Sequence, residues 1–515
     1  MRLNTYLPAF LLLCACLTFA KPAVAEAPPN IVVIMADDLG PGDVGYYHKL
    51  RTGKEPFVAT PYMDALATEG MRFSDGHSST ALCSPTRYCA MTGNLNHRSV
   101  APWGVWSSFR QTPITKIDAT LGRVGQMGGL TTGFIGKYHL GGDFMNAKGT
   151  EVYRGANHKA KPEQVDVSRM VGSGPQQIGF DYSFTMPAGI QGPLYTAYEN
   201  GDWYPFSDDS KLVYLDKTNA LDPAFVSDKG PGVGDSHWDT RRVGPMLADK
   251  AAAFIEDQAG QDKPFLLVFW SPMVHIPHLP PKEFNGRLIA GQGPTPHVDI
   301  IADFDQQVGA IVEALKAQGV YDNTLIFLCS DNGGLRDGKA EKLGHISFNG
   351  LRGSKNQPHE GGHRVPFFAV WPGKIAPDSE SAQPVANRDI VATIADVLGQ
   401  TLKKNQAMDS LSLLPVLLGE AEDDLDRFLP LQGGSNHELI NRRGPWKLII
   451  DSNHPQTEFK KVALFNLYDN PLELEEQNLL THPDHAERVK EMYDEFMRWR
   501  ESGERSTPPM AQSAN

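Results

Sequence analysis

The stretch NIVVIMADDLG (residues 30–40) places a run of apolar residues directly before two aspartates. Such a run is typical of a strand that is buried on both faces of a sheet. Helical patterns separate it from later runs, and the clearest of these is FDQQVGAIVEALKAQG, which ends at Gly319. Strands that alternate with helices predict an α/β fold with a largely parallel sheet flanked by helices. Four further strand-like runs follow along the chain: TTGFI (131–135), FLLVFW (265–270), TLIFLC (324–329) and PFFAVW (366–371).

The N-terminus carries a separate signal. Arg2 precedes an apolar run, YLPAFLLLCACLTFA (6–20), which is too short to span a bilayer comfortably, and an A-x-A site follows at residues 23–25. This arrangement is typical of a secretory signal that is cut after Ala25, so we expect an exported, periplasmic or secreted protein without stable membrane insertion. An N-terminal membrane anchor and lipoprotein processing at LLCAC (12–16) are the alternatives.

The pattern changes at two places along the 515 residues of the chain. Residues 145–245 are rich in Gly, Pro, Asp and Tyr, which indicates long loops and short elements over one edge of the sheet. After about residue 410, short strand patterns precede an amphipathic helix pattern at 486–502. We therefore expect a signal peptide (1–25), a main domain (26–410), a smaller C-terminal α+β subdomain with antiparallel strands and a final helix (411–503), and a disordered tail (504–515).

Charge and cysteine content exclude two classes of protein. The formal net charge is −13 and no long basic run is present, so we expect no nucleic-acid partner. Cys14 and Cys16 would leave with the signal, and the remaining Cys83, Cys89 and Cys329 are too few for a disulfide framework. Cys89 and Cys329 are most simply buried thiols, although a disulfide between them stays open.

Polar side chains follow four of the five strand-like runs. Asp37 and Asp38 end the first, and Asp331 and Asn332 end another. Ligands in an open α/β sheet bind beyond the carboxyl ends of the strands, so these groups are expected to meet. Oxygen donors suit a hard cation, and Ca²⁺ tolerates irregular carboxylate cages better than Mg²⁺. The alternative is that each acid caps a following helix or turn.

The stretch CSPTR (83–87) places a cysteine at a predicted helix start. Pro85 suits the first turn of that helix and Gly93 suits its end. N–H groups and the helix dipole favour an anion beside Cys83, and Arg87 can point back to the same place. A cysteine phosphatase loop is one alternative, but it separates Cys and Arg by five residues, and Cys89 occupies that position here. An inert buried thiol is the other.

CSPTR resembles the C-x-P-x-R signature of the type I sulfatases, the formylglycine-dependent arylsulfatase family of the alkaline phosphatase superfamily. The resemblance implies an alkaline-phosphatase-like fold, with a mixed, largely parallel sheet flanked by helices and a smaller C-terminal α+β domain. The matching segments follow the family's order: NIVVIMADDLG (30–40), TPYMDALATEGMRFSDGHS (60–78), GKYHLG (136–141), PFLLVFWSPMVHIPHLPP (264–281), LIFLCSDNGG (325–334), LRGSKNQPHEGGHRVPFFAVWPGKI (351–375), WKLII (446–450) and LFNLYDNPLELEEQNL (464–479).

The resemblance implies a site built on Cys83, oxidised to formylglycine (3-oxoalanine) by a formylglycine-generating enzyme. The hydrated aldehyde would attack sulfur, and its second hydroxyl would allow sulfate to be expelled. The implied metal ligands of one Ca²⁺ are Asp37, Asp38, Cys83, Asp331 and Asn332. The implied catalytic groups are Cys83, Arg87, Lys137, His139, His275 and Lys355; among them, Lys137 and Lys355 bind sulfate, His139 acts as base and His275 protonates the bridging oxygen.

The sequence departs from the family pattern at positions without a functional side chain. This chain has Thr86 where the family usually has serine, Tyr138 where it has tryptophan and Val274 where it has proline. Ser354 and Ser410 each occupy a position where the family usually has glycine.

Three further aromatic residues and one histidine have weaker assignments. His345 is a candidate substrate-binding residue or a surface-loop histidine. Trp103, Trp106 and Phe109 suit core packing better than stacking on a sugar.

These observations favour an exported sulfuric ester hydrolase acting on a sulfated carbohydrate or aryl sulfate. One alternative is a phosphodiesterase or phosphonate monoester hydrolase of the same superfamily, which rates on matched aryl sulfate and aryl phosphate would distinguish. The other is a non-catalytic protein that binds sulfated glycans, which the intact Cys83, Arg87 and metal ligands disfavour.

Overall fold

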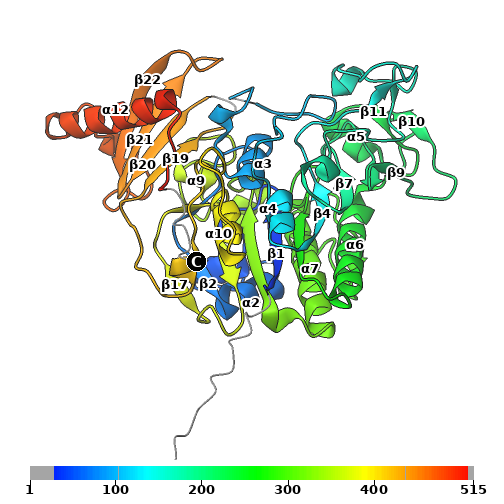
Figure 1. The fold of residues 1–515 in the computed structure, drawn as a ribbon, viewed down its shortest axis with the longest axis horizontal. Helices are drawn as coiled ribbons and strands as arrows, with labels where there is room; N and C mark the ends of the chain where they lie inside the picture. The colour runs from blue at the N-terminus through cyan, green and yellow to red at the C-terminus, as the bar shows by residue number, and fades with distance from the viewer. Residues whose placement is uncertain (1–27, 103, 435–436, 509–515) are drawn as a thin grey trace, which may run out of the picture.

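The computed structural model describes residues 28–102, 104–434 and 437–508 (Figure 1). The predicted signal peptide, Trp103 and the last part of the predicted tail lie outside the described residues. Within these ranges, no helix is both long and apolar enough to cross a membrane.

A ten-stranded sheet forms the centre of the molecule, in the order β17-β2-β16-β15-β1-β12-β4-β7-β8-β9. The strands β15, β1, β12, β4 and β7 are parallel to their neighbours within this group, and antiparallel or short strands flank them. This arrangement confirms the expected mixed, largely parallel sheet. The bounds are β1 Asn30–Ala36, β2 Met71–Phe73, β4 Thr131–Lys137, β7 Tyr182–Met186, β8 Ala197–Glu199, β9 Asp202–Tyr204, β12 Phe265–Trp270, β15 Thr324–Ser330, β16 Phe368–Val370 and β17 Ser379–Ser381.

Helices cover both faces of this sheet. Alternate residues of β1 enter two different cores: Val32 and Ile34 pack on one side, and Ile31 and Val33 on the other. Because both faces of β1 are buried, apolar residues are needed on both, which explains the continuous apolar run of the strand. The helices on the first side are α2 (Pro61–Glu69), α6 (Val243–Ala259) and α7 (Pro296–Ala317), and those on the second are α3 (Cys83–Thr92), α4 (Leu121–Met127) and α10 (Asp389–Val397).

The region 145–245 lies at the β9 edge of the sheet, as expected, and also lengthens it. The strands β7, β8 and β9 come from this region, although its sequence shows no clear strand pattern. Its other elements are β5 Met145–Asn146, β6 Val165–Asp166, β10 Leu212–Leu215, α5 Pro223–Lys229 and β11 Gly232–Asp235.

A separate four-stranded antiparallel sheet carries the C-terminal part of the chain (Figure 1, orange and red). Its strands are β19 Phe428–Gln432, β20 Leu439–Arg443, β21 Trp446–Ser452 and β22 Phe459–Asn466, and α12 (Ala486–Ser502) packs on it. Leu448 and Phe496 from this part share one core with Ile31 and Val33. The small sheet is therefore joined to the main sheet by a continuous apolar core.

Residues 504–508 belong to the tail for which the sequence predicts disorder. Arg505 donates to the carbonyl oxygens of Gln406 and Ala407, both at 3.0 Å, and the Thr507 hydroxyl donates to that of Ser410 at 3.0 Å. These contacts join Arg505 and Thr507 to the loop that precedes α11 (Leu414–Leu417).

Cys83, Cys89 and Cys329 are all buried with free thiols, so the disulfide left open by the sequence is absent among them.

The remaining elements are short connections around the two sheets. Bounds not yet given are α1 Gly45–Thr52, β3 Gly76–His77, β13 Glu283–Phe284, β14 Arg287–Leu288, α8 Gly338–Leu343, α9 Glu360–His363 and β18 Val385–Ala386.

Candidate active site

The carboxyl end of β1 places two buried aspartates beside two lysines. Asp37 Oδ2 lies 2.5 Å from the Nζ atom of Lys137, which is the last residue of β4; β12 lies between β4 and β1 in the sheet. Asp38 lies between Lys355 Nζ, at 2.6 Å from Oδ1, and the Asn332 amide, which donates to Oδ1 at 2.8 Å. Asp38 has a φ of 68°, a left-handed conformation that turns its side chain away from the strand direction. The strand end is therefore shaped to present both carboxylates at one place.

The carboxyl end of β15 supplies the opposite side of the site. Asp331 Oδ2 accepts from Arg87 Nε at 3.0 Å and Nη2 at 2.7 Å, and Asp331 Oδ1 accepts from the backbone N–H of Asp38 at 3.1 Å. Because β1 and β15 pair in parallel from Asn30–Thr324 to Ala36–Ser330, the acids that follow each strand meet. The predicted convergence of the two strand ends is present in the structure.

Two oxygens of this site have no partner within the described structure. Asp37 Oδ1 and Asn332 Oδ1 are buried without a hydrogen bond. One ligand atom each from Asp37, Cys83 and Asp331 lies within 4.8 Å of the others. Buried polar atoms without partners are costly in the absence of a ligand. Oxygen atoms of this kind around one point fit a hard divalent cation.

Cys83 is the first residue of α3, as the sequence predicts, and Gly93 ends that helix with a φ of 71°. The Thr86 hydroxyl donates to the Thr80 carbonyl oxygen at 2.9 Å and accepts from the Thr80 N–H at 3.1 Å. This residue, which replaces the serine of the family pattern, therefore clamps the segment that leads into the helix. Burial raises the pKa of the Cys83 thiol against the effect of Lys137 and Lys355, so the unmodified side chain is a poor thiolate.

The carboxyl end of β4 adds Lys137 and His139. Lys137 is fully buried and also donates to Gln191 Oε1 at 2.7 Å. His139 has a φ of 54° and its Nδ1 is buried without a partner. Burial, followed by the charges of Lys137 and Arg87, holds the pKa of His139 well below its usual range, so the ring is neutral at pH 7.

His275 faces Asp38 from the segment after β12. Its Nδ1 lies 2.6 Å from the Ile276 carbonyl oxygen, which makes Nδ1 the protonated nitrogen of the neutral ring. Nε2 then faces the site, 3.7 Å from Asp38 Oδ2. Burial and the Lys355 ammonium lower the pKa of His275 to about 3, so the imidazole is neutral at pH 7 in the free site.

The three carboxylates do not ionise alike. Burial opposes ionisation of Asp37 and Asp38, but Lys137 beside the first and Lys355 beside the second hold both pKa values below the usual range. For Asp331, burial and the charge of Asp37 outweigh the Arg87 contact and raise the pKa to about 7. Asp331 is therefore the acid whose charge most needs a bound cation.

One residue that contacts the site and one cation near it have no signal in the sequence. Gln191 lies in the irregular region 145–245 and contacts Lys137. Lys229, at the end of α5, lies in the electrostatic field of Asp38 and Lys355; burial lowers its pKa, and its side chain is 18% exposed. Both come from segments without a recognisable motif, so only the folded chain identifies them.

The structure also places the residues with weaker assignments. His345 is buried, with Nε2 2.8 Å from Asp43 Oδ1, so it is not the surface-loop histidine considered from the sequence, and its role in substrate binding stays a prediction. Trp106 and Phe109 pack in the cores, as expected.

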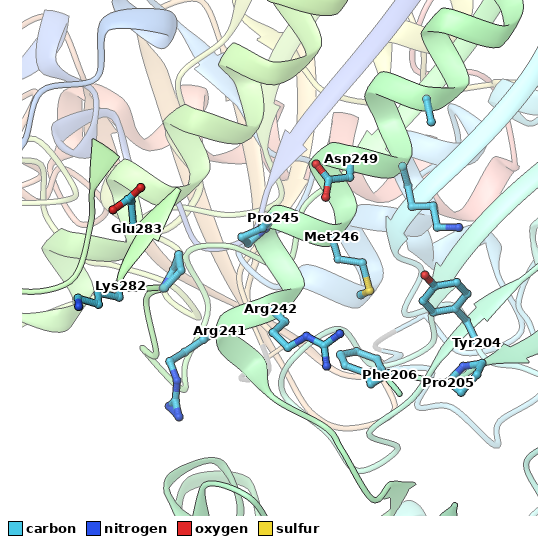
Figure 2. A pocket seen from close by; sticks show the side chains of 13 residues that line it. Tyr204, Pro205, Phe206, Arg241, Arg242, Pro245, Met246, Asp249, Lys282 and Glu283 are labelled. Atoms are coloured by element: carbon cyan, nitrogen blue, oxygen red, sulfur yellow. The ribbon is translucent and has the colours of Figure 1, made fainter. Parts of the chain in front are cut away.

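A cavity of about 780 Å³ lies beside the segment that follows His275 (Figure 2). Arg242 and Lys282 line it and form no ion pair within the described ranges of the chain, and the Arg242 guanidinium lies 5.3 Å from the Phe206 ring centroid. In Figure 2, Tyr204 and Phe206 lie together on one wall, while Lys282 and Glu283 lie across from them. The cavity thus combines aromatic rings with cationic groups.

Residues 29–400 match the sulfatase family model. The chain belongs to the sulfatase family. It is 28% identical to an N-acetylgalactosamine-6-O-sulfatase of Bacteroides thetaiotaomicron, over 96% of this chain and 98% of that protein. It is 30% identical to arylsulfatase A of Bos taurus, over 78% of this chain and 70% of that protein. The sulfatase chain is thus a sulfuric ester hydrolase.

Solved structures share the fold of this sulfatase. One comes from work on the metabolism of multiple glycosaminoglycans by Bacteroides thetaiotaomicron, with a TM-score of 0.76 and 24% identity, covering 92% of this chain and 100% of that one. Another is a protein in complex with its substrate D-glucosamine-2-N,6-O-disulfate, with a TM-score of 0.61 and 17% identity, covering 95% and 100%. These similarities confirm the α/β fold with its additional small antiparallel sheet.

Proposed function

We propose that this sulfatase is exported and removes sulfate from a sulfated carbohydrate, using Cys83 converted to formylglycine and one Ca²⁺. One observation carries the proposal: one ligand atom each from Cys83, Asp37 and Asp331 lies within 4.8 Å of the others. Cys83 is there the first residue of a helix, and Arg87 contacts Asp331. A thiol with a raised pKa is not itself a ready nucleophile, which supports its conversion to another group.

A Ca²⁺ ion and a formylglycine at position 83 both fit the residues around them. Asp37, Asp38, Asp331 and Asn332, with residue 83, would hold the cation, which when bound supplies Lewis-acid stabilisation of a sulfate oxygen. The unpartnered Asp37 Oδ1 and Asn332 Oδ1 support this assignment. Formylglycine, once hydrated, supplies a nucleophilic oxygen and a second hydroxyl that permits release of sulfate.

The cationic side chains have separate tasks. Arg87 donates to Asp331 and to the Lys137 carbonyl oxygen at 2.9 Å, which fixes its guanidinium beside residue 83, where it would offset negative charge on the nucleophile. Lys137 and Lys355 now contact Asp37 and Asp38. With substrate and cation bound, their ammonium groups would stabilise the sulfate oxygens as charge develops.

The two histidines would move protons on opposite sides of sulfur. His139 is neutral with an unpartnered ring nitrogen, as a base for the second hydroxyl of residue 83 requires. His275 directs Nε2 into the site. The negative charge of a bound sulfate ester raises the pKa of the adjacent imidazole, so that Nε2 can carry the proton that passes to the bridging oxygen.

Two observations support a carbohydrate substrate: the name of a relative and the side chains that line a cavity. A relative of similar length is named for an N-acetylgalactosamine sulfate substrate. The cavity beside the segment after His275 offers Arg242 and Lys282, which suit further anionic groups of a sulfated glycan, and Tyr204 and Phe206, which suit a sugar face. The predicted signal peptide supports export to where such polymers are met.

Peptide mass spectrometry of active protein tests the modification of Cys83. We expect part of the Cys83 peptide to carry an aldehyde that a hydrazide reagent captures, and Cys83→Ser to fold without turnover. Active protein with only the unmodified thiol would contradict the mechanism. A panel of defined sulfated oligosaccharides, with free sulfate measured, tests the substrate class; turnover of aryl sulfates alone would contradict it.

A further inference from the structure

A second cluster of metal-ligating side chains lies outside the active site. It consists of Asp43, His297 and His345, called here the Asp43 cluster. Their ligand atoms lie within 4.8 Å of one another. His345 Nε2 is 2.8 Å and His297 Nε2 3.7 Å from the same oxygen, Asp43 Oδ1. The three side chains are 0%, 1% and 5% exposed for Asp43, His297 and His345, so the cluster is closed to bulk solvent.

Three separate parts of the chain bring these residues together. Asp43 ends the short helix Pro41–Asp43 that follows β1, His297 lies in the first turn of α7, and His345 follows α8. The backbone N–H of Gly42 also donates to the Ser347 carbonyl oxygen at 2.8 Å, so the cluster lies where these segments are already in contact.

The Asp43 carboxylate has no ordinary counter-charge. Its Oδ2 accepts from the backbone N–H of Gly40 at 2.9 Å, and no lysine or arginine of the described ranges forms an ion pair with it. Burial opposes its ionisation, yet the adjacent imidazoles of His297 and His345 hold its pKa below the usual range. A buried carboxylate without a cation is strongly unfavourable, so a positive charge belongs here.

The comparable cluster of His77, Glu360 and His363 resolves the same problem differently. There Lys447 Nζ lies 2.9 Å from Glu360 Oε1 and 3.0 Å from His363 Nε2, so an ammonium occupies the place of a cation. The acids of the active site likewise have lysine and arginine partners. Among the four candidate metal groups found in the described residues, the Asp43 cluster alone has no ammonium or guanidinium within ion-pair distance.

We propose that the Asp43 cluster binds a zinc ion through Asp43 Oδ1, His297 Nε2 and His345 Nε2. Two imidazoles and one carboxylate suit Zn²⁺, whereas Ca²⁺ prefers oxygen donors alone. Bond lengths of about 2.0–2.1 Å in a tetrahedron put ligand atoms about 3.3 Å apart. The observed 2.8 Å and 3.7 Å lie on either side of that value.

The surroundings suit a structural zinc site. Ser347 Oγ lies 3.1 Å from His297 Nε2 and offers a fourth donor. His297 Nδ1 lies 3.3 Å from His278 Nε2, which also lies 3.1 Å from the Val274 carbonyl oxygen, so the His278 ring packs beside that of His297. The ion would join the loop after Asp37 and Asp38 to the segment that carries His345 and Ser347, and so support the backbone next to the active site.

Metal analysis of the full chain, produced without a histidine tag, tests the proposal. Mass-spectrometric elemental analysis of dialysed wild type is expected to give about one zinc per chain. His297→Gln and His345→Gln are each expected to retain at least about 10-fold less zinc, since each removes a ligand. His48→Gln is the matched control, because its ring stacks on His345 at 6.3 Å but supplies no ligand atom.

A second readout does not depend on turnover. Co²⁺ added to zinc-free wild type is expected to give the intense visible absorption of a tetrahedral site, and His345→Gln to lack it. Asp331→Asn is expected to bind calcium more weakly and to keep both zinc and the Co²⁺ spectrum. If the variants fail to fold, the wild-type spectrum and a higher melting temperature with zinc still decide the question.

Three results would overturn the proposal. The first is wild type that binds no zinc and shows no tetrahedral Co²⁺ spectrum. The second is zinc kept by folded His297→Gln and His345→Gln. The third is equal zinc loss in His48→Gln.

Discussion

Binding of the proposed calcium ion should depend on pH through Asp331. Its pKa is raised to about 7, chiefly by burial and then by the charge of Asp37, whereas Asp37 and Asp38 have pKa values below the usual range. His275, with a pKa of about 3, does not change its protonation between pH 5 and pH 8. Between pH 5 and 8, Asp331 is therefore the acid of the site whose proton the cation must displace.

The magnitude follows from one proton. Below about pH 7 the calcium affinity should fall about 10-fold per pH unit, or about 1.4 kcal/mol, and be level above pH 8. At pH 5 the site would bind about 50-fold more weakly than at pH 7 and about 100-fold more weakly than on the plateau above pH 8. Asp331→Asn loses a ligand and binds more weakly throughout, but its affinity should not change with pH in this range.

Isothermal titration calorimetry in two buffers with different protonation enthalpies measures both affinity and proton release. Wild type should release close to one proton per calcium at pH 6, about half at pH 7 and almost none at pH 8. A wild-type affinity that stays level from pH 8 to pH 5 would refute the reasoning. The same slope in Asp331→Asn would assign the proton to another group.

The raised pKa of Asp331 also makes the stability of the fold depend on pH. A carboxyl whose pKa is raised on folding stabilises the fold below its ordinary pKa, and that contribution is lost as the pH rises through the folded value. The difference between 3.8 and about 7 corresponds to about 4 kcal/mol as an upper bound. The calcium-free chain should therefore lose stability from pH 5 to pH 8, and calcium should reverse that loss.

Three further outcomes are expected. His275→Ala should slow a sugar sulfate by about 10²–10⁴-fold and nitrophenyl sulfate far less, because only the sugar alcohol needs a proton to leave; equal leaving-group slopes for wild type and variant would assign the proton to another residue. Gln191→Leu should lower kcat/KM about 10-fold, because Lys137 loses a charge-assisted hydrogen bond of about 1.5 kcal/mol; unchanged kinetics with an unchanged circular dichroism spectrum would contradict this. Asp303→Asn should raise the free energy of unfolding at pH 8, by up to about 4 kcal/mol, and less at pH 5, because burial raises the Asp303 pKa to about 7; denaturant curves with an equal gain at both pH values would refute it.

Local sequence predicted the centre of the fold and most of the site. A strand buried on both faces needs a continuous apolar run, so β1, β12 and β15 are visible without any knowledge of their partners. Parallel strands present their carboxyl ends at one edge, so the acids after β1 and β15 are expected to meet. Cys83 at the start of α3 follows from Pro85 and Gly93 in the same way.

The sequence was less informative where long-range contacts decide the structure. The strands β7 to β9 are short and lie in a region without periodicity, so their place in the main sheet depends on pairing with β4. Residues 504–508 have a polar composition that suggests disorder, yet Arg505 and Thr507 bond to the backbone of residues 406–410. Hydrogen bonds to a distant backbone leave no trace in local composition.

The order of residues alone thus determined the α/β fold, the position of Cys83 and the carboxylates expected around it, because each depends on a pattern within a few neighbouring residues. Tertiary structure alone decided that Gln191 meets Lys137, that Asp331 differs in pKa from Asp37, and that His345 faces Asp43. Ionisation and metal binding depend on burial and on charges a few ångströms away. Those neighbours come from segments up to about 300 residues apart in the chain, so they exist only after folding.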